Sequence, residues 1–336
     1  MKRFLLPEGG NFYKANLHSH STVSDGTLTP KEMKKIYMDM GYSVVAFTDH
    51  NVMIPHPELA DKDFLPLNGY EFDLTGGGHG IDYNDRKVCH LCLIALDPDK
   101  RQQVCWTKGK YLYGNSPDYQ HQVVFYGRDD YTRSYTAECI NDVIAKGREH
   151  GFFVTYNHPS WSNENYEQYC SYEQLSAMEI ANFGTQVTGH GDYNPRVYDD
   201  MLRSGKRLYC LATDDNHNWN DRPWDSGGGW VMIKADALEY RKITDALVAG
   251  NFYSSQGPAI KALWVEDGSV HITTSDAQQI FMTTANRRSA MAWAKDGTSL
   301  NEASFKLDTA MVYFRLTVVD NRGRCANTNA YFLDEL

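Results

Sequence analysis

Apolar and polar positions alternate over Tyr13–Leu17, which predicts a short strand, and His18 and His20 follow it directly. Side chains at positions i and i+2 of a strand share one face and lie roughly 7 Å apart along the chain. Both imidazoles can therefore converge on one metal ion. A second apolar run, residues 43–48, is rich in β-branched side chains and predicts a buried strand that delivers His50 at its end.

The segment between these two strands predicts a helix. Thr29 and Glu32 have the spacing of a capping box, with Pro30 at the first helical position. Apolar residues then follow one helical stripe as far as Met40, and Gly41 ends the helix. Together these elements form a βα unit that leads into a second strand. In α/β folds, ligands bind at the carboxyl ends of such strands.

The alternation of strands and helices continues to about residue 257. Further apolar runs predict a strand leading to Glu71, one that contains His90, and strands that end at His158 and at residues 213–217. Amphipathic patterns between them predict helices over 136–148 and 195–202. A polar residue in an apolar run, such as His90, must find a partner or a metal.

Residues 97–135 interrupt this alternation with a long non-periodic segment rich in tyrosine. They also hold four cations that could face a ligand: Lys108, Lys110, Arg128 and Arg133. A segment of this length inside a domain is usually functional or a small subdomain. It is either a cap that closes on a ligand or an ordered surface excursion whose aromatic side chains pack on the domain.

Beyond residue 257 the pattern becomes that of an all-β protein. Residues 262–266 and 269–274 flank Asp267-Gly268, a two-residue hairpin signature, and residues 311–320 alternate with apolar side chains on one face. We therefore expect an α/β domain over residues 1–257 and a small, sandwich-like β domain over residues 258–336.

Composition narrows the functional classes. A formal net charge of −10 argues against a protein whose main partner is a nucleic-acid polymer. No stretch approaches the roughly 20 apolar residues of a membrane span, and Pro7 interrupts the N-terminal apolar residues too early for a signal peptide as written. We therefore expect a cytoplasmic protein with no membrane partner. The seven cysteines are scattered, and Cys89 and Cys92 read as buried thiols rather than metal ligands.

Three motifs, in this order along the chain, resemble those of the polymerase and histidinol phosphatase (PHP) family of metal-dependent phosphoesterases: His18-Ser19-His20, Ser24-Asp25-Gly26 and Thr48-Asp49-His50. The resemblance extends from residue 13 to about 257 and implies a distorted seven-stranded (β/α) barrel. It also implies nine metal ligands, and a residue of the required type stands at every position: His18, His20, Asp25, His50, Glu71, His90, His158, Asp215 and His217. Either Asp214 or Asp215 could fill the eighth position, and we expect Asp215 because it keeps the two-residue spacing to His217.

The same resemblance implies two to three divalent metal ions. Nitrogen and oxygen donors without a thiolate suit Zn, Mn or Fe. By analogy, the first ion is expected on His18, His20, Glu71 and Asp215. Glu71 is expected to bridge to a second ion on His90 and His158, and Asp25, His50 and His217 are expected to hold a third. Six further histidines lie outside the motifs and are expected to be structural: His56, His79, His121, His150, His190 and His271.

The expected function is hydrolysis of a small phosphomonoester, of the nucleotide or sugar phosphate type. In this interpretation Glu71 holds two metal ions together, and a metal-bound water, Asp25 or His217 protonates the leaving group. Arg128 is expected to contact the substrate phosphate, because a guanidinium binds phosphate bidentately. Two alternatives remain open: a metallohydrolase that acts on a non-phosphate substrate, and a non-catalytic binding module stabilised by metal.

Overall fold

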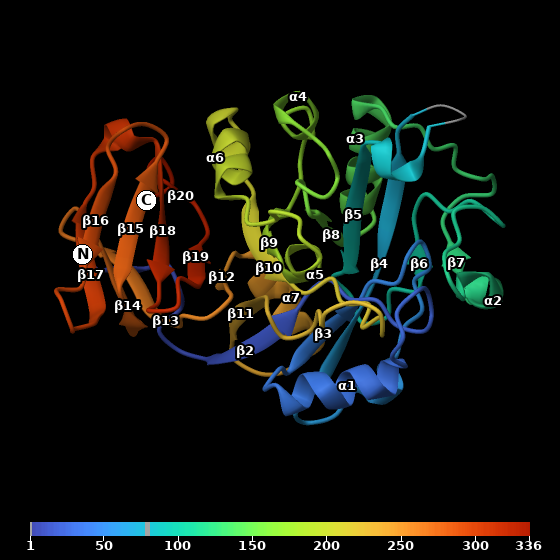
Figure 1. Cartoon of the computed structure of the whole chain (residues 1–336), viewed down its shortest axis with the longest axis horizontal. Coiled ribbons are helices and arrows are strands. Elements are labelled where there is room, and N and C mark those ends of the chain that lie inside the picture. Colours follow the sequence, from blue (N-terminus) through green and yellow to red (C-terminus); the bar gives the residue numbers. More distant parts are fainter. Residues whose placement is uncertain (1, 78–80) are drawn as a thin grey trace.

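The computed structural model describes residues 2–77 and 81–336, which form a mixed α/β structure (Figure 1). His79 therefore lies outside the described residues. Most strands join a single 14-stranded sheet, and a separate four-stranded sheet lies near the C-terminus. Within the described residues, no helix combines the length and apolar character needed to span a membrane.

Seven neighbouring strands carry the predicted site. In sheet order they are β10 (Tyr209–Thr213), β9 (Ala177–Asn182), β8 (Phe152–Tyr156), β5 (Val88–Ala95), β4 (Leu65–Thr75), β3 (Val44–Phe47) and β2 (Asn11–Asn16). β5 runs antiparallel to both neighbours, and the other neighbouring pairs are parallel. An isolated parallel bridge between Ser19 and Asn216 links the chain after β2 to the chain after β10. The two ends of the seven-strand order therefore meet, which brings the carboxyl ends of the parallel strands around one point.

The longer helices begin and end close to where the sequence predicts. They are α1 (Pro30–Asp39), α3 (Ala137–Glu149) and α6 (Pro195–Arg203). The structure also contains α7 (Tyr240–Val248) and the shorter helices α2 (Ser116–Tyr119), α4 (Tyr166–Tyr169) and α5 (Phe183–Val187). The capping box at the start of α1 is confirmed, because Glu32 N–H donates to the Thr29 side chain and Thr29 N–H donates to Glu32. Met33 and Tyr37 on the inner stripe of α1 are buried, so the helix packs its apolar face against the sheet.

The 97–135 segment is ordered and packs on the loops that carry the site. It contains the parallel strands β6 (Gln102–Gln103) and β7 (Val124–Phe125) together with α2. Trp106 is buried in a cluster with Val23 and Val52, which lie next to the motif residues Ser24 and His50. The aromatic packing that the sequence left as one alternative is therefore present.

The C-terminal strands are antiparallel and stand at one end of the molecule (Figure 1). They are β13 (Ile260–Glu266), β14 (Ser269–Ala277), β15 (Gln279–Thr284), β16 (Ala290–Trp293), β17 (Leu300–Lys306), β18 (Tyr313–Val319), β19 (Cys325–Thr328) and β20 (Tyr331–Phe332). The predicted hairpin at Asp267-Gly268 joins β13 to β14. An apolar core between the two sheets contains Leu263 and Val270 from one and Leu316 and Val318 from the other.

Two features tie this β region to the rest of the chain. β1 (Arg3–Phe4), which the expected division assigns to the first domain, pairs with β13, and Leu5 and Leu6 enter the C-terminal apolar core. On the other side, β12 (Phe252–Ser255) pairs with both β11 (Trp230–Ala235) and β19, so the large sheet continues across residue 258 without a break.

Candidate metal centre

The nine candidate ligands come together at the carboxyl ends of the parallel strands. Seven of them follow a strand or lie on the turn after it: His18, His20 and Asp25 after β2, His50 after β3, His158 after β8, and Asp215 and His217 after β10. The other two, Glu71 and His90, lie within β4 and β5. The sequence suggested that the strand leading to Glu71 ends there, but β4 runs on to Thr75 because its pairing with β5 continues as far as Val88.

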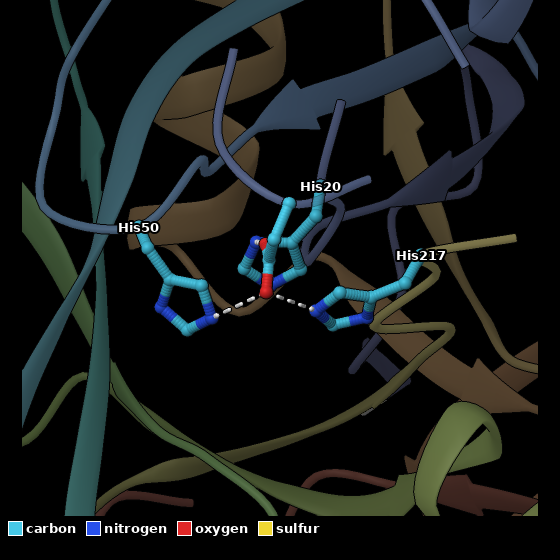
Figure 2. A group of neighbouring side chains, drawn as sticks. His20, His50 and His217 are labelled. Carbon is cyan, nitrogen blue, oxygen red and sulfur yellow. Dashed lines mark ion pairs between the residues drawn. The ribbon is translucent and has the colours of Figure 1, made fainter. Parts of the chain in front are cut away.

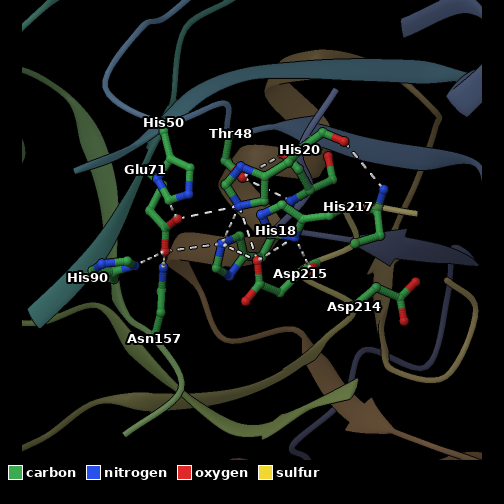
Figure 3. A network of polar contacts seen from close by, with 12 residues as sticks. His18, His20, Thr48, His50, Glu71, His90, Asn157, Asp214, Asp215 and His217 are labelled. Carbon is green, nitrogen blue, oxygen red and sulfur yellow. Dashed lines mark hydrogen bonds and ion pairs between the residues drawn. The ribbon is translucent and has the colours of Figure 1, made fainter. Parts of the chain in front are cut away.

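Glu71 is the centre of this arrangement (Figure 3). Its carboxylate is 1% exposed. Its two oxygens lie 3.1–3.3 Å from ring nitrogens of five histidines: His18, His20, His50, His90 and His158. A carboxylate with imidazoles on both oxygens is placed to serve two cations at once.

Asp215, and not Asp214, faces these histidines. One Asp215 oxygen lies 3.1 Å from the Nε2 atoms of both His18 and His20. The Asp214 carboxylate instead accepts hydrogen bonds of 2.7–2.9 Å from the backbone N–H groups of residues 227–229 and from the Tyr37 hydroxyl. The Asp214 carboxylate thus holds a turn in place. Of the two aspartates that the sequence left as candidates, Asp215 is the one that lies among the histidines.

A second group of donors surrounds Asp25. Figure 2 shows the rings of His20, His50 and His217 directed toward a common point. The Asp25 carboxylate lies 3.5 Å from His217 Nε2 and 3.8 Å from both His50 Nε2 and His20 Nδ1. These separations are longer than hydrogen bonds and leave room for an ion among the four side chains.

The backbone is strained where the ligands are presented. His158 has a φ of 28° and Asp215 a φ of 51°, both in the left-handed region that non-glycine residues rarely adopt. The Asp215 N–H donates to the His18 carbonyl at 2.9 Å, and the His158 N–H donates to Glu179 at 2.8 Å. Such conformations persist only where surrounding contacts enforce them, and they cluster at functional sites.

The donor set fits metal ions. Three groups of donors, each with ligand atoms within 4.8 Å of one another, are His18/His20/Glu71/Asp215, His50/Glu71/His90 and His20/Asp25/His50/His217. In a tetrahedral site with bonds of about 2.0–2.1 Å, ligand atoms lie about 3.3 Å apart. In the first group, the Nε2 atoms of His18 and His20 and one Asp215 oxygen lie 3.1 Å from one another. The Glu71 oxygens lie 3.1 Å from His18 Nε2 and 3.3 Å from His20 Nε2. In addition, His20 Nδ1, His50 Nδ1 and His90 Nε2 are buried without a hydrogen-bond partner in the described chain, as expected of metal ligands.

The grouping differs in two respects from the ligand assignment that the resemblance implies, and the first is that His20 also joins Asp25, His50 and His217. The second is that His50 falls together with Glu71 and His90, where His158 was expected. His158 remains adjacent, with Nε2 3.3 Å from Glu71 and 3.8 Å from Asp215.

The charge balance of the cluster also favours a bound cation. Burial lowers the pKa of His18, but Asp215 and the other nearby carboxylates outweigh it and raise that pKa well above its usual value. Burial likewise opposes ionisation of Glu71, yet the histidines, His18 foremost, hold the pKa of Glu71 well below its usual range. The cluster thus attracts positive charge, and divalent ions can supply it in place of protons.

Comparison with known proteins agrees with this geometry. The model of the PHP domain matches residues 16–214, which is more than half of the chain. The chain belongs to the PHP family. No curated protein matches it.

Several solved structures resemble the chain weakly. A two-domain protein of Bacteroides vulgatus, described as containing a predicted PHP-like metal-dependent phosphoesterase, has 14% identity and a TM-score of 0.44 over 98% of this chain and 90% of that one. A candidate metal-dependent phosphoesterase of Bifidobacterium adolescentis has 15% identity and a TM-score of 0.39, over 65% and 91%. An amidohydrolase of Chromobacterium violaceum, with bound sulfate and no metal, has 17% identity and a TM-score of 0.39, over 60% and 87%. These likenesses are too weak to characterise the chain further.

Buried residues of the PHP domain that the sequence did not single out hold the ligands in place. Glu179 accepts hydrogen bonds from His18 Nδ1 at 2.7 Å, from Thr213 Oγ1 at 2.7 Å and from Asn182 Nδ2 at 2.8 Å. Asn157 donates to Glu71 at 2.8 Å. Partners of this kind fix the ring orientation of a ligand histidine and the position of a ligand carboxylate. A carboxylate inside the apolar run 177–181 is the signal that could have revealed Glu179.

Asp49, which follows β3, supports the loop that carries Asp25 in a comparable way. Its carboxylate accepts hydrogen bonds of 2.8–3.0 Å from the backbone N–H groups of Ser21 and Ser24 and from both serine hydroxyls. This explains why the motif Thr48-Asp49-His50 places an aspartate beside a ligand histidine without making it a ligand.

The metal centre forms the floor of a cavity of about 240 Å³. Asp25 and His217 are among the residues that line it, and its walls are largely aromatic: Tyr83, Tyr113, Trp161 and Trp219. The structure does not bring Arg128 to this cavity; it is exposed and belongs to the surface of the 97–135 segment. The arginine that lines the cavity is Arg222, whose guanidinium stands 4.2 Å from the Trp219 ring centroid.

Proposed function

We propose that the protein is a metal-dependent phosphoesterase that hydrolyses a small phosphomonoester with a metal-activated water. The observation that carries this proposal is the convergence of nine side chains with nitrogen or oxygen donors, Glu71 at their centre, of which seven line one cavity. A cavity of about 240 Å³ is small for a ligand pocket, which favours a compact substrate over a polymer.

We also propose that the seven strands from β10 to β2, whose ends meet at Ser19 and Asn216, form the distorted barrel of the PHP type. The C-terminal β region would then be a second domain. The structural support for a barrel is the meeting of β2 and β10. The support for a separate β domain is its own apolar core, although two strand pairings, β1 with β13 and β12 with β19, join residues on the two sides of residue 258.

Bound divalent ions would lower the pKa of a water molecule and offset charge that develops on the phosphate. The residues of the chain arrange this chemistry. Glu71 fixes the spacing of the ligand groups around its two oxygens, and Glu179 fixes the ring of His18. Asp25 and His217 both line the cavity, so either side chain can hold a proton for the leaving oxygen.

The proposal predicts that the purified protein contains more than one transition-metal ion per chain and hydrolyses phosphomonoesters only in that state. Elemental analysis, together with a phosphatase panel before chelation, after chelation and after addition of Mn²⁺, checks both parts. His190, exposed and outside all donor groups, gives the control: His190→Ala should keep its metal. Protein without metal that was never exposed to chelator contradicts the proposal. Metal-loaded protein that hydrolyses other bonds but no phosphate ester would favour a different metallohydrolase.

A second prediction concerns the cation that binds the substrate. Arg222 lines the cavity, and no ion pair within the described parts of the chain engages its guanidinium, so it is free to bind a phosphate oxygen. Arg222→Ala should lower kcat/KM by about tenfold or more, with metal content unchanged. Arg128→Ala is the matched control, and we expect wild-type kinetics for it. If the Arg128 variant is impaired and the Arg222 variant is not, the phosphate contact lies on the 97–135 segment instead.

A further inference from the structure

The two tryptophans that line the cavity stand on different parts of the metal centre. The Trp161 ring packs against His158 and His90, at centroid distances of 4.8 and 5.3 Å. The Trp219 ring packs against His217 at 4.5 Å. His90 and His217 lie at opposite ends of the network in Figure 3. A group attached to a phosphate at the metal centre can therefore contact one of these indole rings.

Both rings are held in place before a ligand arrives. The Trp219 indole N–H donates to the Asp25 carbonyl oxygen at 2.7 Å. The turn that presents Trp161 is fixed by Asp192, which is buried and accepts hydrogen bonds from the N–H groups of Ser160 and Trp161 at 2.8 and 2.9 Å. Both tryptophans remain half-buried, so each keeps surface for a ligand. Rigid aromatic surfaces bind with little loss of conformational entropy.

Apart from Arg222, which we assign to the phosphate, and the exposed Tyr83, the polar side chains of the same walls are already engaged within the described parts of the protein. The Thr185 and Thr188 hydroxyls donate to carbonyl groups at the start of α5 and within it, at distances of 3.0–3.2 Å. The Asp225 carboxylate accepts hydrogen bonds from the N–H groups of His217 and Asn218 at 2.8 and 3.0 Å. A ligand rich in hydroxyl groups would find few unengaged partners there, whereas a flat apolar ring would find aromatic faces.

We infer that the substrate is a phosphomonoester whose alcohol carries a planar aromatic ring, which stacks on Trp161 or on Trp219 while the phosphate lies at the metal centre. This inference rests on the proposed phosphoesterase function and selects among its substrates. It makes the two tryptophans specificity-determining residues. Polyhydroxylated sugar phosphates become poor substrates.

The test compares esters that differ in the ring and not in the leaving group. 2-Phenylethyl phosphate and 2-cyclohexylethyl phosphate release alcohols of similar acidity and size, and glucose 6-phosphate represents the sugar esters. For the metal-loaded wild type, kcat/KM for the phenyl ester should exceed the other two by about tenfold or more, since stacking on an aromatic side chain contributes at this level. Of Trp161→Leu and Trp219→Leu, the variant that removes the stacking ring should bring the ratio of phenyl to cyclohexyl ester close to one.

Phenylalanine variants separate stacking from a structural role. Trp219→Phe loses the hydrogen bond to the Asp25 carbonyl but keeps a flat face, so it should retain the preference even if its overall activity falls. Trp161→Phe should behave in the same way. Equal kcat/KM for the phenyl and cyclohexyl esters in the wild type, a preference for glucose 6-phosphate, or retention of the phenyl preference in both leucine variants would each overturn the inference.

A binding measurement distinguishes this failure from failure of the proposed function. If no ester is hydrolysed by metal-loaded protein, the phosphoesterase proposal is contradicted. The affinities of 2-phenylethylphosphonate and 2-cyclohexylethylphosphonate, measured by calorimetry on the same protein, then decide the ring preference alone. Tighter binding of the phenyl compound supports the aromatic site, and equal binding refutes it.

Discussion

Glu71→Ala should abolish hydrolysis and remove metal from more than one position, whereas Asp25→Ala should retain measurable activity and most of its metal. The reason is the number of neighbours: the Glu71 oxygens face five histidines at 3.1–3.3 Å, while Asp25 faces three at 3.5–3.8 Å. Loss of a residue that supports a metal ligand typically costs about 10–100-fold, and we expect loss of one terminal ligand such as Asp25 to cost a factor near the upper end of this range. We expect Asp25→Ala to fall in this range and Glu71→Ala to exceed it.

Elemental analysis and kcat/KM on the same preparations measure this difference. Glu71→Gln is the informative companion, because it keeps the size of the side chain and an oxygen for the Asn157 amide but removes the charge. It should lose metal as Glu71→Ala does. The cooperative urea transitions of all variants should be compared, so that loss of fold is not taken for loss of ligand. Equal metal content and equal residual activity in Glu71→Ala and Asp25→Ala would exclude the bridging role.

Local spacing made part of the cluster of candidate ligands predictable. His18 and His20 share one face of a strand by simple alternation, and Thr29 with Glu32 fixes the start of α1, so the first βα unit could be predicted from adjacent residues alone. His90 stands out because an imidazole in an apolar strand needs a partner.

The choice between Asp214 and Asp215 depended on contacts between distant segments. The backbone N–H groups that hold Asp214 come from residues 227–229, more than ten positions later in the chain. In the sequence these residues are only a glycine-rich stretch. Contacts between distant segments also explain why the sequence did not indicate Arg222. Its neighbour Trp219 donates a hydrogen bond to the Asp25 carbonyl, and no periodicity predicts this contact between residues 194 positions apart.

The contacts that join the C-terminal β region to the remainder of the fold also could not be predicted from the sequence. Alternation predicts that one face of β18 is apolar, but in the structure both faces of the strand are buried. In the structure Arg315 of β18 forms a bidentate pair with Asp199 of α6, at 2.9 and 2.8 Å, and the two side chains are 4% and 9% exposed. The Tyr313 hydroxyl donates to the same carboxylate at 3.2 Å. This buried ion pair joins the two parts of the chain.

Asp199→Ala should therefore lower the free energy of unfolding by about 3–5 kcal/mol, because it leaves the Arg315 guanidinium buried without its counter-charge. That is a large fraction of the total for a protein whose stability is about 5–15 kcal/mol. Urea denaturation followed by tryptophan fluorescence measures it. Arg196→Ala on the same helix is the matched control. Its guanidinium pairs with Asp200 but is 81% exposed, so we expect a loss of about 1 kcal/mol or less.

A double variant tests the cause of the destabilisation. If the cost of Asp199→Ala arises from an unpaired buried charge, then Asp199→Leu combined with Arg315→Met should recover much of the lost stability, since apolar side chains of similar size replace the pair. If instead the double variant is as unstable as the sum of the two single changes, the contribution comes from packing of α6 against β18 and not from charge. A loss below about 1 kcal/mol in Asp199→Ala would show that the ion pair does not hold the C-terminal region in place. The metal centre, on the far ends of β2, β4 and β10, should keep its metal in every variant that remains folded.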